Sequence, residues 1–433
     1  MANNQNEPSF EEEPREGTSS KTEQVQVEVK VDKKKKQDLD VQENLVNISK
    51  IFDFSDGDLL RVLKTVDKKV LKNLRLCCER LSMLMLDESL WILDHRKEPM
   101  IPSQMLPYEN FLEPLTHSLA VRGDFERNID NILGHLFFYK LQEICRLLKE
   151  LIIEDYYINI HEVTMQQFPK TIEKLELKNC IAYSDYFCQH FSFTSFSEIC
   201  LFMPNLRCLI LDNMIWRITP KSLRDIGELT HLKELRITSC FRIHTFHPEI
   251  DIHTFKCNFK TLEILDLQNT AVEIRLFEWL CQIKTLKHLY LQCPTYLKKE
   301  WSDELLEDFK KLYYKQKFVP LKMFDKLLYD FHSKVESLSG ENKIEEIINY
   351  RNYIFQDYFM SNISKYVSRC NNLKTLFIRH YSHVTEKDIN LLASTLPNLE
   401  KLDITGCSVT IEDVKHFRSQ RLNVEVVSSF GTI

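Results

Sequence analysis

The chain has 433 residues, with 57 basic and 63 acidic side chains, so its formal net charge is −6. This mild acidity argues against a general nucleic-acid-binding protein, which would show a strongly basic face. No run of about 18 apolar residues occurs, so no membrane span is expected. The first 20 residues are polar and acidic, which argues against a signal peptide.

The numbers and spacing of glycine and cysteine exclude further classes of protein. Only eight glycines occur, and the closest two, Gly123 and Gly134, are 11 positions apart. The nucleotide-binding motifs G-x-G-x-x-G and G-x-x-x-x-G-K-[ST] and the hydrolase motif G-x-S-x-G need closer glycines and are excluded; H-E-x-x-H is absent as well. Thirteen cysteines, an odd number without a C-x-x-C pair, indicate free thiols in a cytoplasmic and/or nuclear protein.

Residues 1–44 are expected to be a disordered tail. They contain 11 acidic and 7 basic residues but one aromatic residue, Phe10. Such a segment cannot bury enough apolar area to offset the entropy lost on ordering. Two alternatives to a solvated tail remain. The basic run from Lys33 to Lys36 is compatible with a nuclear-import signal, and the alternating valines from Val25 to Val31 are compatible with an added edge strand.

Residues 45–95 are predicted to form a small domain of three short helices. Ser55 or Asp56 can cap the first helix, and apolar residues recur at helical spacing on all three. So short a stretch provides too little core to be stable alone. We therefore expect an apolar surface that receives a partner, formed by Leu59, Leu63, Leu71, Leu74 and Trp91.

The same stretch resembles an F-box. The likeness is carried by four segments, Phe54–Leu63, Val70–Leu74, Leu76–Leu81 and Asp87–Trp91, of which the last, D-E-S-L-W, is the most specific. Ser55 stands where the family usually has proline, and Leu81 stands where it often has tryptophan. The resemblance implies docking on the small adaptor of a cullin-based SCF ubiquitin ligase. The adaptor contacts that it implies are Phe54, Ser55, Leu59, Leu60, Val62, Leu63, Val66, Leu71, Leu74, Cys78, Leu81, Leu90 and Trp91.

A leucine-rich phrase returns through the rest of the chain. Its clearest copy is Leu232–Cys240, which follows the pattern L-x-x-L-x-L-x-x-C. Further copies start at Leu148, Ile172, Leu206, Leu262, Leu286, Leu373 and Leu399. Each copy predicts one strand and one helix. The pattern resembles the cysteine-containing class of leucine-rich repeats, which implies an α/β fold: a solenoid shaped as an arc or horseshoe, with parallel strands on the concave side.

The solenoid is expected over residues 148–433, after a linker and a degenerate first repeat over 96–147. An aromatic-rich helical insertion is expected at about 295–354, either as a packed spacer or as part of a binding site. Cys180, Cys240 and Cys407 take the small-residue position after a strand, where cysteine serves as a small apolar side chain with a weak donor. We predict that these three cysteines are structural.

The concave face can be read from the strands. The residue between the two inward-facing positions of each strand points away from the core. On seven strands these residues are Glu176, Ile210, Arg236, Asp266, Tyr290, Phe377 and Asp403. Charge mixed with aromatic rings suits a protein target, because tyrosine and arginine are frequent hot-spot residues. The alternative is a solvated face without a ligand.

One set of metal-binding residue types lies close together in the sequence: Cys240, His244, His247, His253 and Cys257. Its spacing departs from known zinc sites, so no metal and no cofactor are expected, and no catalytic residue can be recognised from spacing.

The resemblances imply a non-catalytic substrate receptor of an SCF-type ubiquitin ligase. Its F-box would bind the adaptor and thereby the cullin scaffold, and its repeats would bind an unknown target protein. No nucleic-acid or membrane partner is expected. The alternative is a leucine-rich-repeat interaction scaffold without a ligase role.

Overall fold

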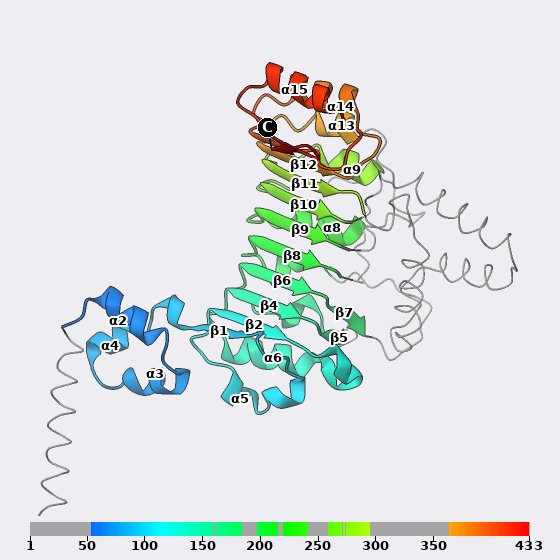
Figure 1. Ribbon diagram of the computed structural model, residues 1–433. Coiled ribbons are helices and arrows are strands. Elements are labelled where there is room, and N and C mark those ends of the chain that lie inside the picture. The colour runs from blue at the N-terminus through cyan, green and yellow to red at the C-terminus, as the bar shows by residue number, and fades with distance from the viewer. Residues whose placement is uncertain are drawn as a thin grey trace, which may run out of the picture. The chain divides into compact units, whose positions relative to one another are not determined.

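The computed structural model divides the chain into two compact units, Met1–Leu90 and Trp91–Ile433 (Figure 1). It describes residues 53–159, 162–183, 196, 198–214, 220–240, 259–270, 272, 274–294 and 363–432. The tail expected over residues 1–44 and the insertion expected at about 295–354 lie outside these described residues.

The described part of the first unit holds three short α-helices and a 3-10 helix. Their bounds are α2 Asp56–Leu63, α3 Lys68–Leu74, α4 Glu79–Leu84 and η1 Glu88–Leu90. Each α-helix begins after a side chain that accepts a hydrogen bond from a backbone N–H of its first turn. The Ser55 hydroxyl accepts from the Asp58 N–H at 3.2 Å, and the Asp67 carboxylate accepts from the Lys69 N–H at 2.7 Å. The Cys78 sulfur accepts from the Leu81 N–H at 3.4 Å. Of the two candidate caps for the first helix, the structure selects Ser55.

The first unit has buried apolar side chains on all three α-helices and just beyond α4. They are Leu59, Leu63, Leu71, Leu81, Leu84, Met85 and Leu90. The Arg80 guanidinium ties α4 to the start of α2, because it donates to the Asp56 carboxylate at 2.9 and 2.7 Å and to the Phe54 carbonyl at 2.6 Å. The helices therefore close around these leucines.

The second unit is built on one long sheet (Figure 1). In order across the sheet its strands are β1 Ile92–His95, β2 Ser118–Arg122, β4 Glu150–Glu154, β6 Lys174–Lys178, β8 Cys208–Asp212, β9 Glu234–Thr238, β10 Ile264–Gln268, β11 His288–Gln292, β12 Thr375–Arg379, β13 Lys401–Asp403, β14 Glu425–Ser428 and β15 Gly431–Thr432. All neighbours pair in parallel except β14 and β15, which form an antiparallel hairpin at the end. The sheet begins with β1, well before residue 148, where the sequence pattern places the start of the solenoid.

The remaining elements lie between the strands. The helices are α5 Tyr108–Phe111, α6 His135–Ile144, α7 Ile199–Phe202, α8 Pro220–Gly227, α9 Ile274–Leu280, α13 Ile363–Val367, α14 Glu386–Thr395 and α15 Ile411–Gln420, with 3-10 helices η2 Pro102–Met105, η3 Phe125–Asn131 and η4 Met165–Gln167. A second, parallel sheet contains β3 Ile132–Leu133, β5 Tyr157–Asn159 and β7 Ile181–Tyr183. One strand of the long sheet per repeat, with helical elements between, is a leucine-rich-repeat type of solenoid.

The leucines of the repeated phrase form a continuous core. Leu235 and Ile237 of β9 are buried, as are their equivalents Leu289 and Leu291 of β11, and all belong to one cluster that runs through the second unit. Strand β11 pairs directly with β12, with Leu289 opposite Leu376, although the two strands are more than 80 residues apart in the sequence. The repeat ladder is therefore continuous from β11 to β12.

A left-handed residue ends the strand in most repeats. Positive φ angles of 49–62° occur at Asp155, Asn179, Asn213, Ser239, Asn269 and His380, and a φ of 75° occurs at Gly406. Asparagine, aspartate and glycine adopt this conformation most readily. The side chains also link neighbouring repeats: Asn179 donates to Asp155 at 2.8 Å, and Asn213 donates to Asn179 at 2.7 Å. This ladder sets the tight turn that precedes each cysteine position.

The three repeat cysteines follow that turn and are structural, as predicted. Each thiol donates to a backbone carbonyl of the preceding repeat: Cys180 to Ile153 at 3.3 Å, Cys240 to Leu211 at 3.5 Å and Cys407 to Ile378 at 2.9 Å. Burial raises the pKa of each of these thiols to about 12. The threonine of another repeat, Thr270, makes the same bond to Ile237 at 2.7 Å.

These environments predict a clear order of thiol reactivity. In the folded chain, iodoacetamide should modify the exposed Cys77 rapidly and leave Cys180 and Cys240 unmodified, because a buried thiol with a pKa of about 12 supplies almost no thiolate at neutral pH. Peptide mapping by mass spectrometry after timed labelling measures the order. In denaturant all three should react alike. Native labelling of Cys240 as fast as Cys77 would contradict the buried position.

Candidate functional site

The seven residues predicted for the concave face form one row across the sheet. Strand register places Glu176 opposite Ile210, then Arg236, Asp266, Tyr290, Phe377 and Asp403 in turn. Neighbouring strands of a sheet are about 4.8 Å apart, so consecutive members are within side-chain contact. We call this row the open-face row. Register extends it to Ile152 and Ala120, which the sequence did not identify because their repeats are degenerate.

Two aromatic rings are neighbours in the open-face row, close to its Asp403 end. The rings of Tyr290 and Phe377 meet edge to face, with centroids 4.8 Å apart and an interplanar angle of 89°. The Arg379 guanidinium lies 4.6 Å from the centroid of Phe377. Both residues are half-buried, so part of each side chain remains accessible to a partner. Such aromatic and arginine groups are the usual anchors of protein interfaces.

Two buried carboxylates flank the aromatic pair. Asp266 is 2% exposed and Asp403 is 1% exposed. Arg379 donates to Asp403 at 2.8 and 2.6 Å, and Thr405 donates from its N–H at 3.0 Å and its hydroxyl at 2.7 Å. Burial opposes ionisation of Asp403, but these donors outweigh it and lower the pKa of its carboxyl.

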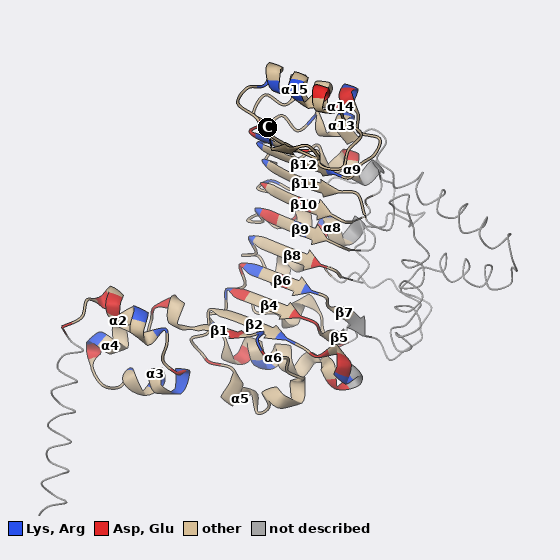
Figure 2. Cartoon of the chain, viewed as in Figure 1, with Lys and Arg blue, Asp and Glu red and all other residues tan. Residues whose placement is uncertain are grey.

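The second carboxylate is held more weakly. The Asp266 carboxylate accepts a hydrogen bond from Arg236 at 3.4 Å and bonds from Gln268 at 3.1–3.3 Å. Arg236 also forms an ion pair with Glu234. Burial dominates here and raises the pKa of the Asp266 carboxyl. Basic and acidic residues both lie along the sheet (Figure 2), so the face is largely paired within itself rather than charged with one sign. The arrangement suits a protein surface more than a phosphate track.

The thirteen residues predicted to contact an adaptor fall into three groups. Leu59, Leu63, Leu71, Leu81, Leu90 and Trp91 are buried; Leu60, Val66, Leu74 and Cys78 are partly buried; and Phe54, Ser55 and Val62 are exposed. The expected apolar surface therefore differs from the observed one, because most of the leucines expected on it are buried within the unit. Their role in adaptor binding stays a prediction.

A different set of apolar side chains faces solvent in the first unit. These are Phe54, Val62, Val70, Leu76, Met83 and Leu86, of which Leu76 is the most open at 84% exposed. The sequence did not single out Val70, Leu76, Met83 or Leu86 as contacts. The available signal for Val70 and Met83 was their position off the buried stripe of α3 and α4, where a polar residue would be expected; Leu76 and Leu86 follow the ends of these helices.

The set of possible metal ligands from Cys240 to Cys257 lies mostly outside the described residues. Cys240 is already engaged with the Leu211 carbonyl, and His244, His247, His253 and Cys257 lie outside the described residues. Within the described part of the chain, no group of three or more His, Cys, Asp or Glu side chains is placed to hold a metal ion. No helix in that part combines the length and apolar character needed to cross a membrane.

Comparison with known proteins gives no family. No protein-family model matches the sequence, and no curated protein sequence matches it. Among solved structures, a leucine-rich-repeat protein of Leptospira interrogans is 15% identical at a TM-score of 0.29, covering 86% of this chain and 97% of that one. The yeast Rad7–Elc1 complex gives 13% identity and a TM-score of 0.38, covering 95% and 98%. The assignment as a repeat solenoid therefore rests on the strand ladder itself.

Proposed function

We propose that this chain is the substrate-recognition subunit of an SCF-type, cullin-based ubiquitin ligase. The helices of residues 53–90 bind the ligase adaptor, and the repeats bind the target protein. The observation that carries the proposal is the F-box-like sequence from Phe54 to Trp91. Its first two segments fall on α2 and α3, and its third ends in the first turn of α4. The chain performs no bond chemistry in this proposal.

The exposed apolar side chains of the first unit support an interface there. Six large apolar residues are exposed on about 40 residues of chain, and they provide apolar area that a partner can cover. The buried leucines hold the helices, so the contact itself falls to the exposed set, with Val62 and Leu76 prominent in it. This division separates residues that fold the unit from residues that bind.

The open-face row supports target binding by the repeats. Tyr290, Phe377 and Arg379 form a compact, partly exposed group. Asp403, which accepts hydrogen bonds from Thr405, holds the arginine in place. A held side chain loses less entropy when it binds. Such a receptor speeds ubiquitin transfer by raising the effective concentration of the target near the conjugating enzyme, because the two are then held in one complex.

The adaptor interface predicts a sensitivity to charge at exposed positions. Val62→Asp combined with Leu76→Asp should weaken co-purification of the SCF adaptor about tenfold, since each change removes apolar area and buries a carboxylate on binding. Quantitative immunoblotting of adaptor pulled down with the full-length chain is the measurement. Circular dichroism should be unchanged, because both side chains are exposed.

The control is Leu201→Asp, at a leucine on α7 of the second unit whose 64% exposure lies between those of Val62 and Leu76; it should leave adaptor recovery at the wild-type level. The ligase proposal fails if wild-type chain recovers no adaptor at low salt, or if both variants behave alike. In that outcome the repeats are an interaction scaffold without a ligase role.

A further inference from the structure

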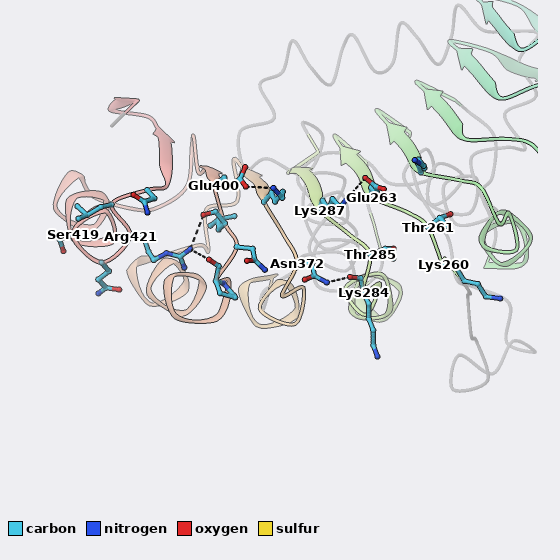
Figure 3. A pocket seen from close by; sticks show the side chains of 18 residues that line it. Lys260, Thr261, Glu263, Lys284, Thr285, Lys287, Asn372, Glu400, Ser419 and Arg421 are labelled. Atoms are coloured by element: carbon cyan, nitrogen blue, oxygen red, sulfur yellow. Dashed lines mark hydrogen bonds and ion pairs between the residues drawn. The ribbon is translucent and has the colours of Figure 1, made fainter.

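A groove runs along the edge of the sheet where strands β9 to β14 begin (Figure 3). Its volume is ≈ 1180 Å³, above the usual range of small-molecule sites, about 300–1,000 Å³. It is lined by the residues that precede each strand, and not by any member of the open-face row. This edge is therefore a second surface, independent of the proposed target-binding face.

The groove is basic in a chain whose net charge is −6. Its basic lining residues are Lys233, Lys260, Lys284, Lys287, Lys374 and Arg421. Two carboxylates oppose them: Glu263 binds Lys287 at 2.8 Å, and Glu400 binds Lys374 at 2.7 Å. Six cations against two anions leave a local excess of four positive charges.

Four of the six basic residues have no carboxylate partner in the groove, namely three lysines and Arg421. Arg421 is occupied, because its guanidinium donates to backbone carbonyls at the end of α14, including Ala393 and Leu396 at 2.8 Å each. Lys233, Lys260 and Lys284 are exposed and make no ion pair with any described residue. Figure 3 shows the side chains of Lys260 and Lys284 extending away from the ribbon. These three ammonium groups are available to a ligand.

The wall that carries the lysines is held by a row of polar side chains. One residue per repeat donates to a carbonyl of the previous repeat: Thr261 to Leu232 at 2.8 Å, Thr285 to Leu262 at 2.7 Å, Asn372 to Lys284 at 2.7 Å and Asn398 to Asn371 at 3.0 Å. These carbonyls are satisfied within the protein. A ligand in the groove therefore meets lysine donors rather than free backbone acceptors.

We propose that this groove binds an extended acidic peptide segment of a partner protein. Five strand spacings of about 4.8 Å span roughly 24 Å, the length of about seven extended residues. Lysine ammonium groups on successive repeats match carboxylates spaced along such a segment. At the other end, Leu422 is 75% exposed and offers an apolar contact. The described lining residues include no aromatic ring for base stacking, which disfavours single-stranded nucleic acid.

The test uses the full-length chain and a fluorescein-labelled peptide of about seven Asp and Glu residues with one Leu. Fluorescence anisotropy should show binding that weakens as salt is added, because exposed charges are screened. Lys260→Glu combined with Lys284→Glu should weaken binding about tenfold, since two attractions become two repulsions. The Asn and Gln analogue of the peptide should bind far more weakly.

The control variant is Lys387→Glu combined with Lys415→Glu, which changes the net charge equally on exposed positions of α14 and α15 outside the groove lining. It should bind the acidic peptide like wild type. Equal weakening in both variants, or no binding at low salt, overturns the proposal. Tighter binding of a single-stranded RNA of equal charge at the same lysines would make the groove a nucleic-acid site instead. None of these readouts depends on the adaptor, so the ligase proposal stands or falls separately.

Discussion

Replacing Asp403 with alanine should lower the free energy of unfolding of the solenoid by about 2–3 kcal/mol. The carboxylate is 1% exposed and accepts two bonds from Arg379 and two from Thr405. Its removal leaves a partly buried guanidinium and a backbone N–H without their acceptor. Urea unfolding at neutral pH, followed by circular dichroism, measures the change.

The equivalent carboxylate three strands away provides the matched comparison. Asp266 lies in the same open-face row, but its pKa is raised by burial, whereas the pKa of Asp403 is lowered. Asp403→Asn should therefore be destabilising at neutral pH, and Asp266→Asn should be neutral or stabilising. The difference arises because Arg379 grips Asp403 with two short bonds, while Arg236 reaches Asp266 at 3.4 Å and is shared with Glu234.

The two carboxylates should also respond to pH with opposite sign. The lowered pKa of Asp403 gives stability that is present above the unfolded-state pKa of about 3.9 and is lost as pH falls through the folded-state value. The raised pKa of Asp266 gives a contribution that is complete below about 3.9 and is lost as pH rises through its folded-state value. Unfolding of both Asn variants at a series of pH values would contradict this account if the two stability differences moved in the same direction.

The periodic parts of the chain were the most predictable. The phrase from Leu232 to Cys240 fixes which residues of β9 face the core, and every equivalent copy follows in register. The row from Glu176 to Asp403 could be written down in advance because alternation along a strand is strict. The degenerate repeats around Ala120 and Ile152 were harder, since substitutions hide the pattern while the backbone still pairs.

Side-chain pairing could not be read from the same pattern. Nothing in the spacing distinguishes Asp266 from Asp403, because the difference lies in how closely an arginine on a neighbouring strand approaches. The positive φ angles of Asn179, Asn213 and Asn269 were open to prediction, because asparagine adopts this conformation more readily than most residues. In the first unit, the spacing of Leu59 and Leu63 identified an amphipathic face but not whether that face packs within the unit or against a partner.

A glycine in the last repeats carries the other large predicted effect. Gly406→Ala should lower the free energy of unfolding by about 3 kcal/mol, from left-handed backbone strain together with steric overlap. Gly406 has a φ of 75°, and a Cβ atom there would lie 2.2 Å from Nδ1 of His380. The His380 backbone is held, because its φ is 62° and its N–H donates to the Thr405 carbonyl at 2.8 Å, so only a rotation of its ring can relieve the overlap.

Two further variants separate strain from overlap. Gly431→Ala replaces a glycine with a φ of 106° whose Cβ would meet nothing within 4 Å, at the end of the terminal hairpin. It should cost about 1 kcal/mol or less, because backbone strain alone applies and the hairpin end can fray. Adding His380→Ala to Gly406→Ala should recover the part of the loss due to overlap, a favourable coupling in a double-mutant cycle. Strict additivity of the two changes would show that the ring of His380 does not restrict this turn. The whole loss of stability in Gly406→Ala would then come from backbone strain.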